Sequence, residues 1–288
     1  MIPASFDYIA PQSLDEAVRA LADHGEEAKL LAGGHSLLPL MKLRLAHPKV
    51  LIDLSRIPSL RGISQQEDKI IVGALTTHYQ IESSQLLKQK CPLLSQTARL
   101  IGDVQVRNRG TVGGSLTHAD PSADLPAAIL ALAGELKLRG PKGDRAVRAE
   151  EFFLGPMTAA IEPTEILTEI RVPVLAPRCG SAYLKMAQQA SGFAIVGVAV
   201  WLRLGKRRIL EDIGLGVTGL SVKPFRARAV EERLRGNKLS PKLIEESAAI
   251  VAEGSDPLED IHASATFRAH LARVYTGRAI QEAAKKTA

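Results

Sequence analysis

Residues 31–39 read Leu31-Ala32-Gly33-Gly34-His35-Ser36-Leu37-Leu38-Pro39 and follow a short apolar run with strand character. Consecutive glycines let the backbone turn with positive φ and bring successive amide groups close to an anion. The hydroxyl of Ser36 and the N-terminus of the next predicted helix add further donors. This first glycine segment (residues 31–39) therefore indicates a pyrophosphate cradle, or else a purely structural turn. It matches neither the GxGxxG nor the GxxxxGK[ST] motif.

A second glycine segment (residues 109–118) reads Arg109-Gly110-Thr111-Val112-Gly113-Gly114-Ser115-Leu116-Thr117-His118. We expect it to be a loop that repeats the chemistry of the first, with Gly114 at positive φ. The flanking hydroxyl groups that would act as donors belong to Thr111, Ser115 and Thr117. Two such segments suggest two units that converge on one ligand.

Two aspartates follow the second glycine segment. Asp124 opens an apolar run that is typical of a helix, where its carboxylate is either an N-cap or a hydrogen-bond acceptor for a ribityl or ribose hydroxyl. Asp120, followed by Pro121, is interpreted as a turn residue. His24, His47, His78, His262 and His270 lack the spacing of metal ligands and are interpreted as structural or surface residues.

The surrounding sequence predicts a mixed α and β protein in two domains. Ser13 and Glu16 form a capping-box pattern that opens a helix over residues 14–23. Strands are predicted at 29–32, 50–54, 69–74, 135–138, 165–172, 181–185, 194–204 and 208–218. Helices are predicted at 84–100, 225–234, 241–252 and 263–284.

Two prolines, Pro173 and Pro177, interrupt the pattern and mark a linker. We therefore expect a first domain over residues 1–177, divided into subdomains of about 1–57 and 58–177. Strands followed by helices then predict a separate α+β domain over residues 178–288.

Composition excludes several protein classes. With 45% hydrophobic and 24% charged residues, the chain is neither disordered nor of low complexity. Its longest apolar runs reach about ten residues, half of what a membrane-spanning helix needs, so we expect no transmembrane segment. No signal peptide is recognised, which predicts a cytoplasmic protein. Cys91 and Cys179 lie far apart in the sequence, so any iron–sulfur cluster is expected in another chain.

Positive charge is concentrated in one region of the sequence. The formal net charge is +6, while residues 178–238 contain twelve lysines and arginines against four acidic residues. The region is interpreted as a solvated basic face or as a docking face for a partner or an anionic ligand, with Arg203, Lys206, Arg207 and Arg208 as candidates. A basic nucleic-acid-binding protein is an alternative, although an aromatic content of 4% argues against base stacking.

In this context the two glycine segments resemble those of the FAD-binding medium subunits of the molybdenum hydroxylases, the family of xanthine dehydrogenase, aerobic carbon monoxide dehydrogenase and quinoline oxidoreductase. The matches are Ala32-Gly33-Gly34-His35-Ser36, Thr111-Val112-Gly113-Gly114-Ser115, Phe6-Asp7-Tyr8, Glu165-Ile166-Leu167 and Asp260-Ile261-His262-Ala263-Ser264-Ala265. The resemblance implies an α+β fold: a bipartite FAD-binding domain of the vanillyl-alcohol oxidase type, followed by a C-terminal α+β domain.

The resemblance also implies a cofactor site. The residues that the resemblance places against the adenosine and pyrophosphate are Lys29, Leu30, Ala32, Gly33, Gly34, His35, Ser36 and Leu37. The residues that it places near the phosphates and the ribityl chain are Thr111, Gly113, Gly114, Ser115 and His118. Asp124 aligns with a ribityl-binding aspartate, Leu167 with an apolar contact and Lys185 with a lysine at the flavin.

Phe193 departs from carbon monoxide dehydrogenases, in which a tyrosine or tryptophan follows Gly-Asp. It either shields a flavin face or packs in the core. The resemblance assigns neither a catalytic residue nor a metal ligand to this chain.

The activity implied by the resemblance is electron transfer. FAD would be bound noncovalently, since covalent attachment at His35 occurs only in more distant relatives. A small subunit with two [2Fe-2S] clusters would supply the electrons, and an external acceptor would receive them. A large subunit would carry molybdopterin cytosine dinucleotide, in a dimer of heterotrimers. A free-standing flavin oxidase or reductase is the alternative.

Overall fold

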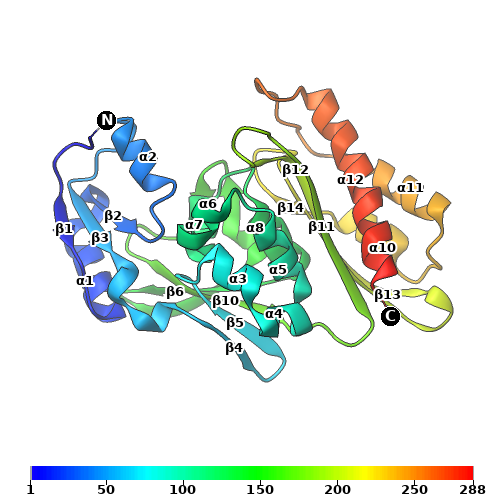
Figure 1. Ribbon diagram of the computed structural model, residues 1–288, viewed down its shortest axis with the longest axis horizontal. Helices are drawn as coiled ribbons and strands as arrows, with labels where there is room; N and C mark the ends of the chain where they lie inside the picture. The colour runs from blue at the N-terminus through cyan, green and yellow to red at the C-terminus, as the bar shows by residue number, and fades with distance from the viewer. Residues whose placement is uncertain (1, 288) are drawn as a thin grey trace.

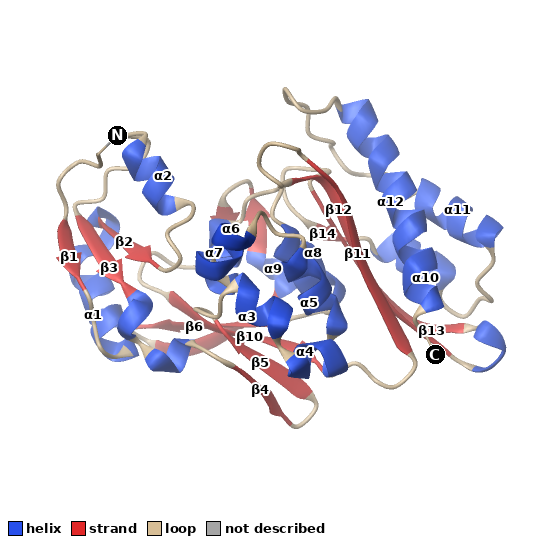
Figure 2. Ribbon diagram, viewed as in Figure 1, coloured by secondary structure: helices blue, strands red, loops and turns tan. Residues whose placement is uncertain are grey.

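The computed structural model describes residues 2–287, which form three units side by side, each built on its own β-sheet (Figure 1). The N-terminal unit lies at one end and the C-terminal unit at the other. Strands and helices alternate in the N-terminal unit. In the middle unit a run of consecutive helices over residues 78–131 lies between the strands at 69–73 and 135–140, and the C-terminal unit begins with strands and ends with helices (Figure 2). This mixed composition confirms the predicted α+β class.

The N-terminal unit contains a parallel sheet in the order β1–β3–β2. Its elements are β1 (Asp7–Ile9), α1 (Leu14–His24), β2 (Ala28–Leu31), α2 (Leu37–Lys42) and β3 (Val50–Asp53). The helix α1 begins where the sequence predicts, because the Ser13 hydroxyl accepts a hydrogen bond from the backbone N–H of Glu16. The first glycine segment connects β2 to α2.

The middle unit contains an antiparallel sheet in the order β4–β5–β10–β6–β7. Its strands are β4 (Ile63–Gln66), β5 (Lys69–Gly73), β6 (Glu135–Gly140), β7 (Gly143–Arg148) and β10 (Ile166–Pro173), with a small pair β8 (Phe153–Gly155) and β9 (Thr158–Ala159). Its helices are α3 (His78–Ser83), α4 (Gln85–Lys90), α5 (Pro92–Arg99), α6 (Val104–Arg109), α7 (Val112–His118), α8 (Asp124–Ala131) and α9 (Ala149–Phe152).

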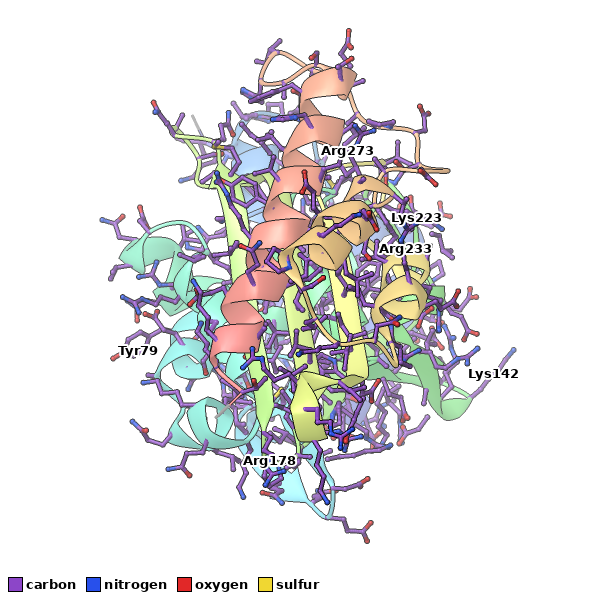
Figure 3. The ribbon with its side chains drawn as sticks, turned by 90° about the vertical axis from the view of Figure 1, so that its right-hand side faces the viewer. Tyr79, Lys142, Arg178, Lys223, Arg233 and Arg273 are labelled. Carbon is purple, nitrogen blue, oxygen red and sulfur yellow. The ribbon has the colours of Figure 1, made fainter. Side chains whose placement is uncertain are left out.

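The C-terminal unit contains an antiparallel sheet in the order β11–β12–β13–β14. Its elements are β11 (Cys179–Ala187), β12 (Ala194–Leu204), β13 (Leu210–Thr218), β14 (Phe225–Arg226), α10 (Arg228–Leu234), α11 (Pro241–Ala249) and α12 (Ala265–Lys285). The three helices cover the outer face of this sheet (Figure 3). Its inner face packs against α8 of the middle unit.

Two glycines of β13 allow α8 to approach the sheet closely. A Cβ atom at Gly214 would lie 1.9 Å from the backbone oxygen of Ala131, and one at Gly216 would lie 2.0 Å from that of Ala127. The indole N–H of Trp201 donates to the same Ala131 oxygen at 2.7 Å. The backbones of the middle and C-terminal units are therefore in direct contact. This close packing fixes the position of α8 and of the side chains on it.

Three local predictions differ from the structure. The single helix predicted over residues 84–100 is two helices, because Pro92 cannot donate its backbone nitrogen to continue α4. The predicted helix over residues 225–234 begins with the short strand β14. The second glycine segment is largely helical, as described below. The proposed domain divisions near residues 57 and 177 stay predictions.

Candidate functional site: the glycine segments and Asp124

The two glycine segments touch each other through their backbones. A Cβ atom at Gly33 would lie 2.3 Å from the backbone oxygen of Arg109 and 2.9 Å from the Cα of Gly110. No side chain fits in this space, so only glycine at position 33 allows the N-terminal and middle units to meet here. The two segments are thus in direct contact, while their convergence on one ligand stays a prediction.

The first glycine segment has the features of an anion cradle. Gly34 adopts φ +78°, the left-handed conformation that favours glycine. Within residues 2–287, the backbone N–H groups of Gly33, Gly34, His35 and Ser36 donate no hydrogen bond. His35 and Ser36 are also exposed. Four consecutive free donors at such a turn fit a phosphate-containing ligand.

The second glycine segment does not repeat this arrangement, so the predicted second loop is wrong. Thr111 is the N-cap of α7, and its hydroxyl accepts from the Gly114 N–H at 3.2 Å. The Gly113 N–H donates to the Ala74 oxygen at 2.8 Å. Gly114 is helical rather than at positive φ. The backbone amides here are already used inside the protein, because Thr111 begins a helix.

The glycines of α7 serve close approach instead. A Cβ atom at Gly113 would lie 2.7 Å from the side chain and backbone of Ala74. A Cβ atom at Gly114 would approach only the Thr111 hydroxyl within 4 Å. The room left at Gly114 is compatible with a bound group, and the half-buried Ser115 and His118 follow it on the same helix.

His78 lies against the second glycine segment as a buried, neutral imidazole. Its backbone N–H donates to the Gly110 oxygen at 2.9 Å, and a Cβ atom at Gly110 would lie 2.8 Å from its ring. Burial, followed by the charges of His35 and Arg107, lowers the pKa of His78 to about 4. The ring therefore packs the segment without adding charge, which agrees with its interpretation as a structural residue.

Asp124 is buried at the start of α8 in an ion pair with Lys185. The Lys185 ammonium lies 2.8 Å from Oδ1 and donates to Oδ2 at 3.0 Å, and the side chain of Lys185 is only 5% exposed. The Tyr183 hydroxyl donates to Oδ1 at 2.5 Å. The N-cap of α8 is Ala123, so the alternative interpretation of Asp124 as an N-cap is wrong.

Burial raises the pKa of the Asp124 carboxyl above its ordinary value, and both Lys185 and Tyr183 oppose this shift. The pKa of Tyr183 is raised well above its ordinary value by burial and by the neighbouring Asp124. We refer to Asp124, Tyr183 and Lys185 as the Asp124 cluster. It joins the middle unit to the C-terminal unit.

Sequence reasoning missed Tyr183. The available signal is its spacing from Lys185: residues two apart on a strand point to the same face, so both reach α8 from β11. A tyrosine can donate a hydrogen bond through its hydroxyl. When it lies on the same strand face as a lysine that is predicted to contact the cofactor, it is a candidate donor to the cofactor or to the carboxylate that binds it.

The other predicted residues lie on separate elements. Lys29 is exposed and Leu30 half-buried on β2, while Ala32 and Leu37 are half-buried at the two ends of the first glycine segment. Leu167 is buried in the core of the middle sheet. Phe193 immediately precedes β12 and is 44% exposed, so the core-packing alternative for it is wrong.

Two family models match the chain. The FAD binding domain in molybdopterin dehydrogenase matches residues 4–175, and the CO dehydrogenase flavoprotein C-terminal domain matches residues 181–283. The chain belongs to this family of FAD-binding medium subunits of molybdenum hydroxylases. It is therefore an oxidoreductase subunit with an FAD-binding domain, and the nucleic-acid alternative is not supported.

Full-length relatives support this membership. The chain is 39% identical to the carbon monoxide dehydrogenase medium chain of Hydrogenophaga pseudoflava, over 98% of both chains. It is 37% identical to the glyceraldehyde dehydrogenase medium chain of Sulfolobus acidocaldarius, over 99% of this chain and 100% of that one. A solved Hydrogenophaga pseudoflava carbon monoxide dehydrogenase that lacks the Mo-pyranopterin moiety matches with a TM-score of 0.97, 40% identity and complete coverage of both chains.

In the described part of the chain, no helix is long and apolar enough to cross a membrane. Residues 2–287 also contain no group of three or more His, Cys, Asp or Glu side chains that could hold a metal ion.

The basic region is not one continuous patch. Arg178 lies at the lower end of the C-terminal unit, whereas Lys223 and Arg233 lie along its side (Figure 3). Half of its twelve cations are in ion pairs with carboxylates: Lys185, Arg203, Arg226, Arg228, Arg233 and Arg235. Lys206, Arg207 and Arg208 form the turn between β12 and β13. The solvated face and the docking face both stay predictions.

Proposed function

We propose that this medium subunit is the electron relay of its complex, receiving electrons from iron–sulfur clusters of a small partner subunit and passing them to an external acceptor. The observation that carries this proposal is that the chain has two features suited to hold FAD: the free anion cradle at residues 33–36 and the buried Asp124 cluster. The cysteines of this chain are not suited to bind an iron–sulfur cluster. Cys91 is buried, which raises the pKa of its thiol to about 12.

The residues present fit FAD, and we propose the following roles. The free N–H groups of residues 33–36 donate to the pyrophosphate, and the open side of α7 at Gly114 makes room for it. The Asp124 carboxylate accepts a hydrogen bond from the ribityl chain, while Lys185, Leu167 and Phe193 adjoin the flavin. The cofactor itself supplies the exchange between two-electron and one-electron transfer, so the protein needs no acid or base of its own.

For the assembly, we propose a large subunit with molybdopterin cytosine dinucleotide, a small subunit with two [2Fe-2S] clusters, and a dimer of such heterotrimers. Relatives are named after different substrates, carbon monoxide and glyceraldehyde among them, which supports a substrate site outside the medium chain. The cytoplasmic location expected from the sequence remains part of the proposal.

The iron–sulfur partner is expected to dock near Phe193, where we place the flavin, rather than on the basic turn at residues 206–208. This turn lies at the end of β12 opposite to Phe193. A strand of 11 residues spans about 36 Å at roughly 3.3 Å per residue. Neutralising Arg207 and Arg208 is therefore not expected to slow electron entry.

Co-purification tests the proposed assembly. If the tagged chain is isolated from its native host under mild conditions, molybdenum and iron should elute with it and with two further polypeptides. The measurement is metal analysis of the eluate together with its visible spectrum. A yellow protein that elutes alone, without iron or molybdenum, would favour the free-standing oxidase.

Acid precipitation tests the mode of FAD attachment. The His35 side chain is exposed, and the closer relatives in the family imply noncovalent binding. Precipitating the holoprotein should therefore release all of the flavin into the supernatant, as measured by its fluorescence. Flavin that stays in the pellet would point to a covalent bond, and His35→Ala would then release it.

A further inference from the structure

The C-terminal unit holds the chain segment that leads into Asp124. The Thr218 hydroxyl lies 2.7 Å from the backbone oxygens of both Pro121 and Ala123, to which it donates. The backbone N–H of Gly219 donates to the Pro121 oxygen at 2.8 Å. Residues 121–124 belong to the middle unit, so the location of a predicted FAD ligand depends on the domain that follows it.

Tyr183 acts on the Asp124 carboxylate itself. Its hydroxyl donates to Oδ1 at 2.5 Å, and both side chains are buried. Gly197 on the neighbouring strand reserves the space for this hydroxyl, because a Cβ atom there would lie 2.3 Å from it. Gly197 leaves space for the Tyr183 hydroxyl, and this hydroxyl donates to the Asp124 carboxylate. Both features indicate that the hydrogen bond is a specific part of the structure.

We propose that Tyr183 is a positioning residue of the FAD site: it fixes the Asp124 carboxylate in the orientation that accepts a hydroxyl group of the cofactor. This inference rests on the proposed role of Asp124 in FAD binding. A carboxylate has about four lone-pair sites, and Tyr183 and Lys185 leave part of them for a ligand.

Lys185 is less suited to this role, since it is shared. Its ammonium also donates to the backbone oxygen of Gly192 at 2.6 Å, which ties it to the turn that precedes Phe193. In the described chain, the Tyr183 hydroxyl donates to Asp124 alone. The orientation of the carboxylate therefore depends most directly on the tyrosine.

The hydrogen bond also has a consequence for pH. Burial raises the pKa of Asp124, while Lys185 and Tyr183, both from β11, lower it. In the described chain, the other elements packed against α8 contribute no further charge to this carboxyl. Without the tyrosine hydroxyl its pKa rises further, and the carboxylate is protonated at a higher pH. A protonated Asp124 is a poorer acceptor, so FAD binding is lost earlier on acidification.

The test compares FAD binding by the full-length, FAD-stripped chain and its Tyr183→Phe variant. FAD is titrated at a series of pH values from neutral downward, and the quenching of its fluorescence gives Kd at each pH. We expect a Kd about tenfold higher for Tyr183→Phe at neutral pH. We also expect the acidic midpoint of binding to move to higher pH, because the carboxyl loses a donor that lowers its pKa.

Two comparison variants separate this inference from others. Trp201→Phe also removes one hydrogen bond between the C-terminal unit and α8, but at Ala131, and should leave Kd and the midpoint unchanged. Asp124→Asn tests the proposed ligand itself. If Asp124→Asn weakens FAD binding while Tyr183→Phe matches the wild type, Tyr183 is not a positioning residue. If neither variant changes Kd, the FAD role of Asp124 fails, and with it this inference.

Gly197→Ala provides a second route that needs no change at Tyr183. Its Cβ atom would lie 2.3 Å from the tyrosine hydroxyl, against 3.0 Å from the Thr218 methyl and 3.1 Å from the tyrosine Cζ. The hydroxyl is therefore the atom that it displaces first, and the variant should reproduce the higher Kd and the higher midpoint. In the Tyr183→Phe background the same substitution should add little, because the displaced hydroxyl is already gone. Effects that add in full in the double variant would overturn the inference.

Discussion

Asp124→Ala is expected to lower the free energy of unfolding of the FAD-free protein by about 3–5 kcal/mol. The reason is the Lys185 ammonium, which pairs with Asp124 at 2.8 Å and whose side chain is only 5% exposed. Removing the carboxylate leaves this charge buried without its counter-charge, and leaves the Tyr183 hydroxyl without its acceptor. Urea denaturation at neutral pH, followed by circular dichroism, measures the loss.

A double variant is the control for this prediction. Asp124→Ala combined with Lys185→Met removes both charges and keeps an apolar chain of similar length at position 185. It should recover most of the lost stability, since the cost comes from the unpaired charge. An Asp124→Ala single variant within about 1 kcal/mol of wild type would mean that the pair is solvated in solution and the cluster is not a buried junction.

Gly33→Val is expected to abolish most FAD retention, because only glycine fits where the backbones of the two segments meet. The branched side chain would have to enter a space in which a Cβ already lies 2.3 Å from the Arg109 oxygen and 2.9 Å from the Gly110 Cα. Both of these atoms belong to the backbone and cannot rotate away. The two glycine segments would separate, and the free amides of the cradle would be displaced from the second segment.

Gly155→Val is the matched control. A Cβ atom at Gly155 would have no neighbour within 4 Å, and this glycine lies in the strand β8, where a β-branched residue is favoured. The variant should purify with a full complement of flavin. The ratio of flavin to protein absorbance gives the result for both variants. Equal flavin content in Gly33→Val and wild type would show that the contact between the segments is not needed for FAD.

The sequence predicted the elements with a strong local cause. The N-cap at Ser13 begins α1, and the alternating run at residues 194–204 is the strand β12. The prediction from sequence failed where one residue with a strong local preference interrupted the expected pattern. Thr111 turned the second glycine segment into a helix, and Pro92 divided a longer one.

The site was predicted only in part, because its decisive contacts join residues far apart in the sequence. Gly33 was expected to bend the chain, but its larger role is to let the backbone of Arg109 approach. The burial of Lys185 and its pairing with Asp124 depend on how β11 packs on α8, which no local pattern encodes. Tyr183 was missed for the same reason.

In the proposed relay, electrons reach this chain from a partner, and rapid mixing with an organic substrate shows whether they do. The substrate is one that reduces the purified complex, and the signal is the visible flavin absorption. We expect the assembled complex to bleach rapidly. The isolated FAD-loaded chain should stay yellow with the same substrate, yet bleach with dithionite. Rapid bleaching of the isolated chain by the organic substrate would contradict the relay and identify an autonomous oxidase.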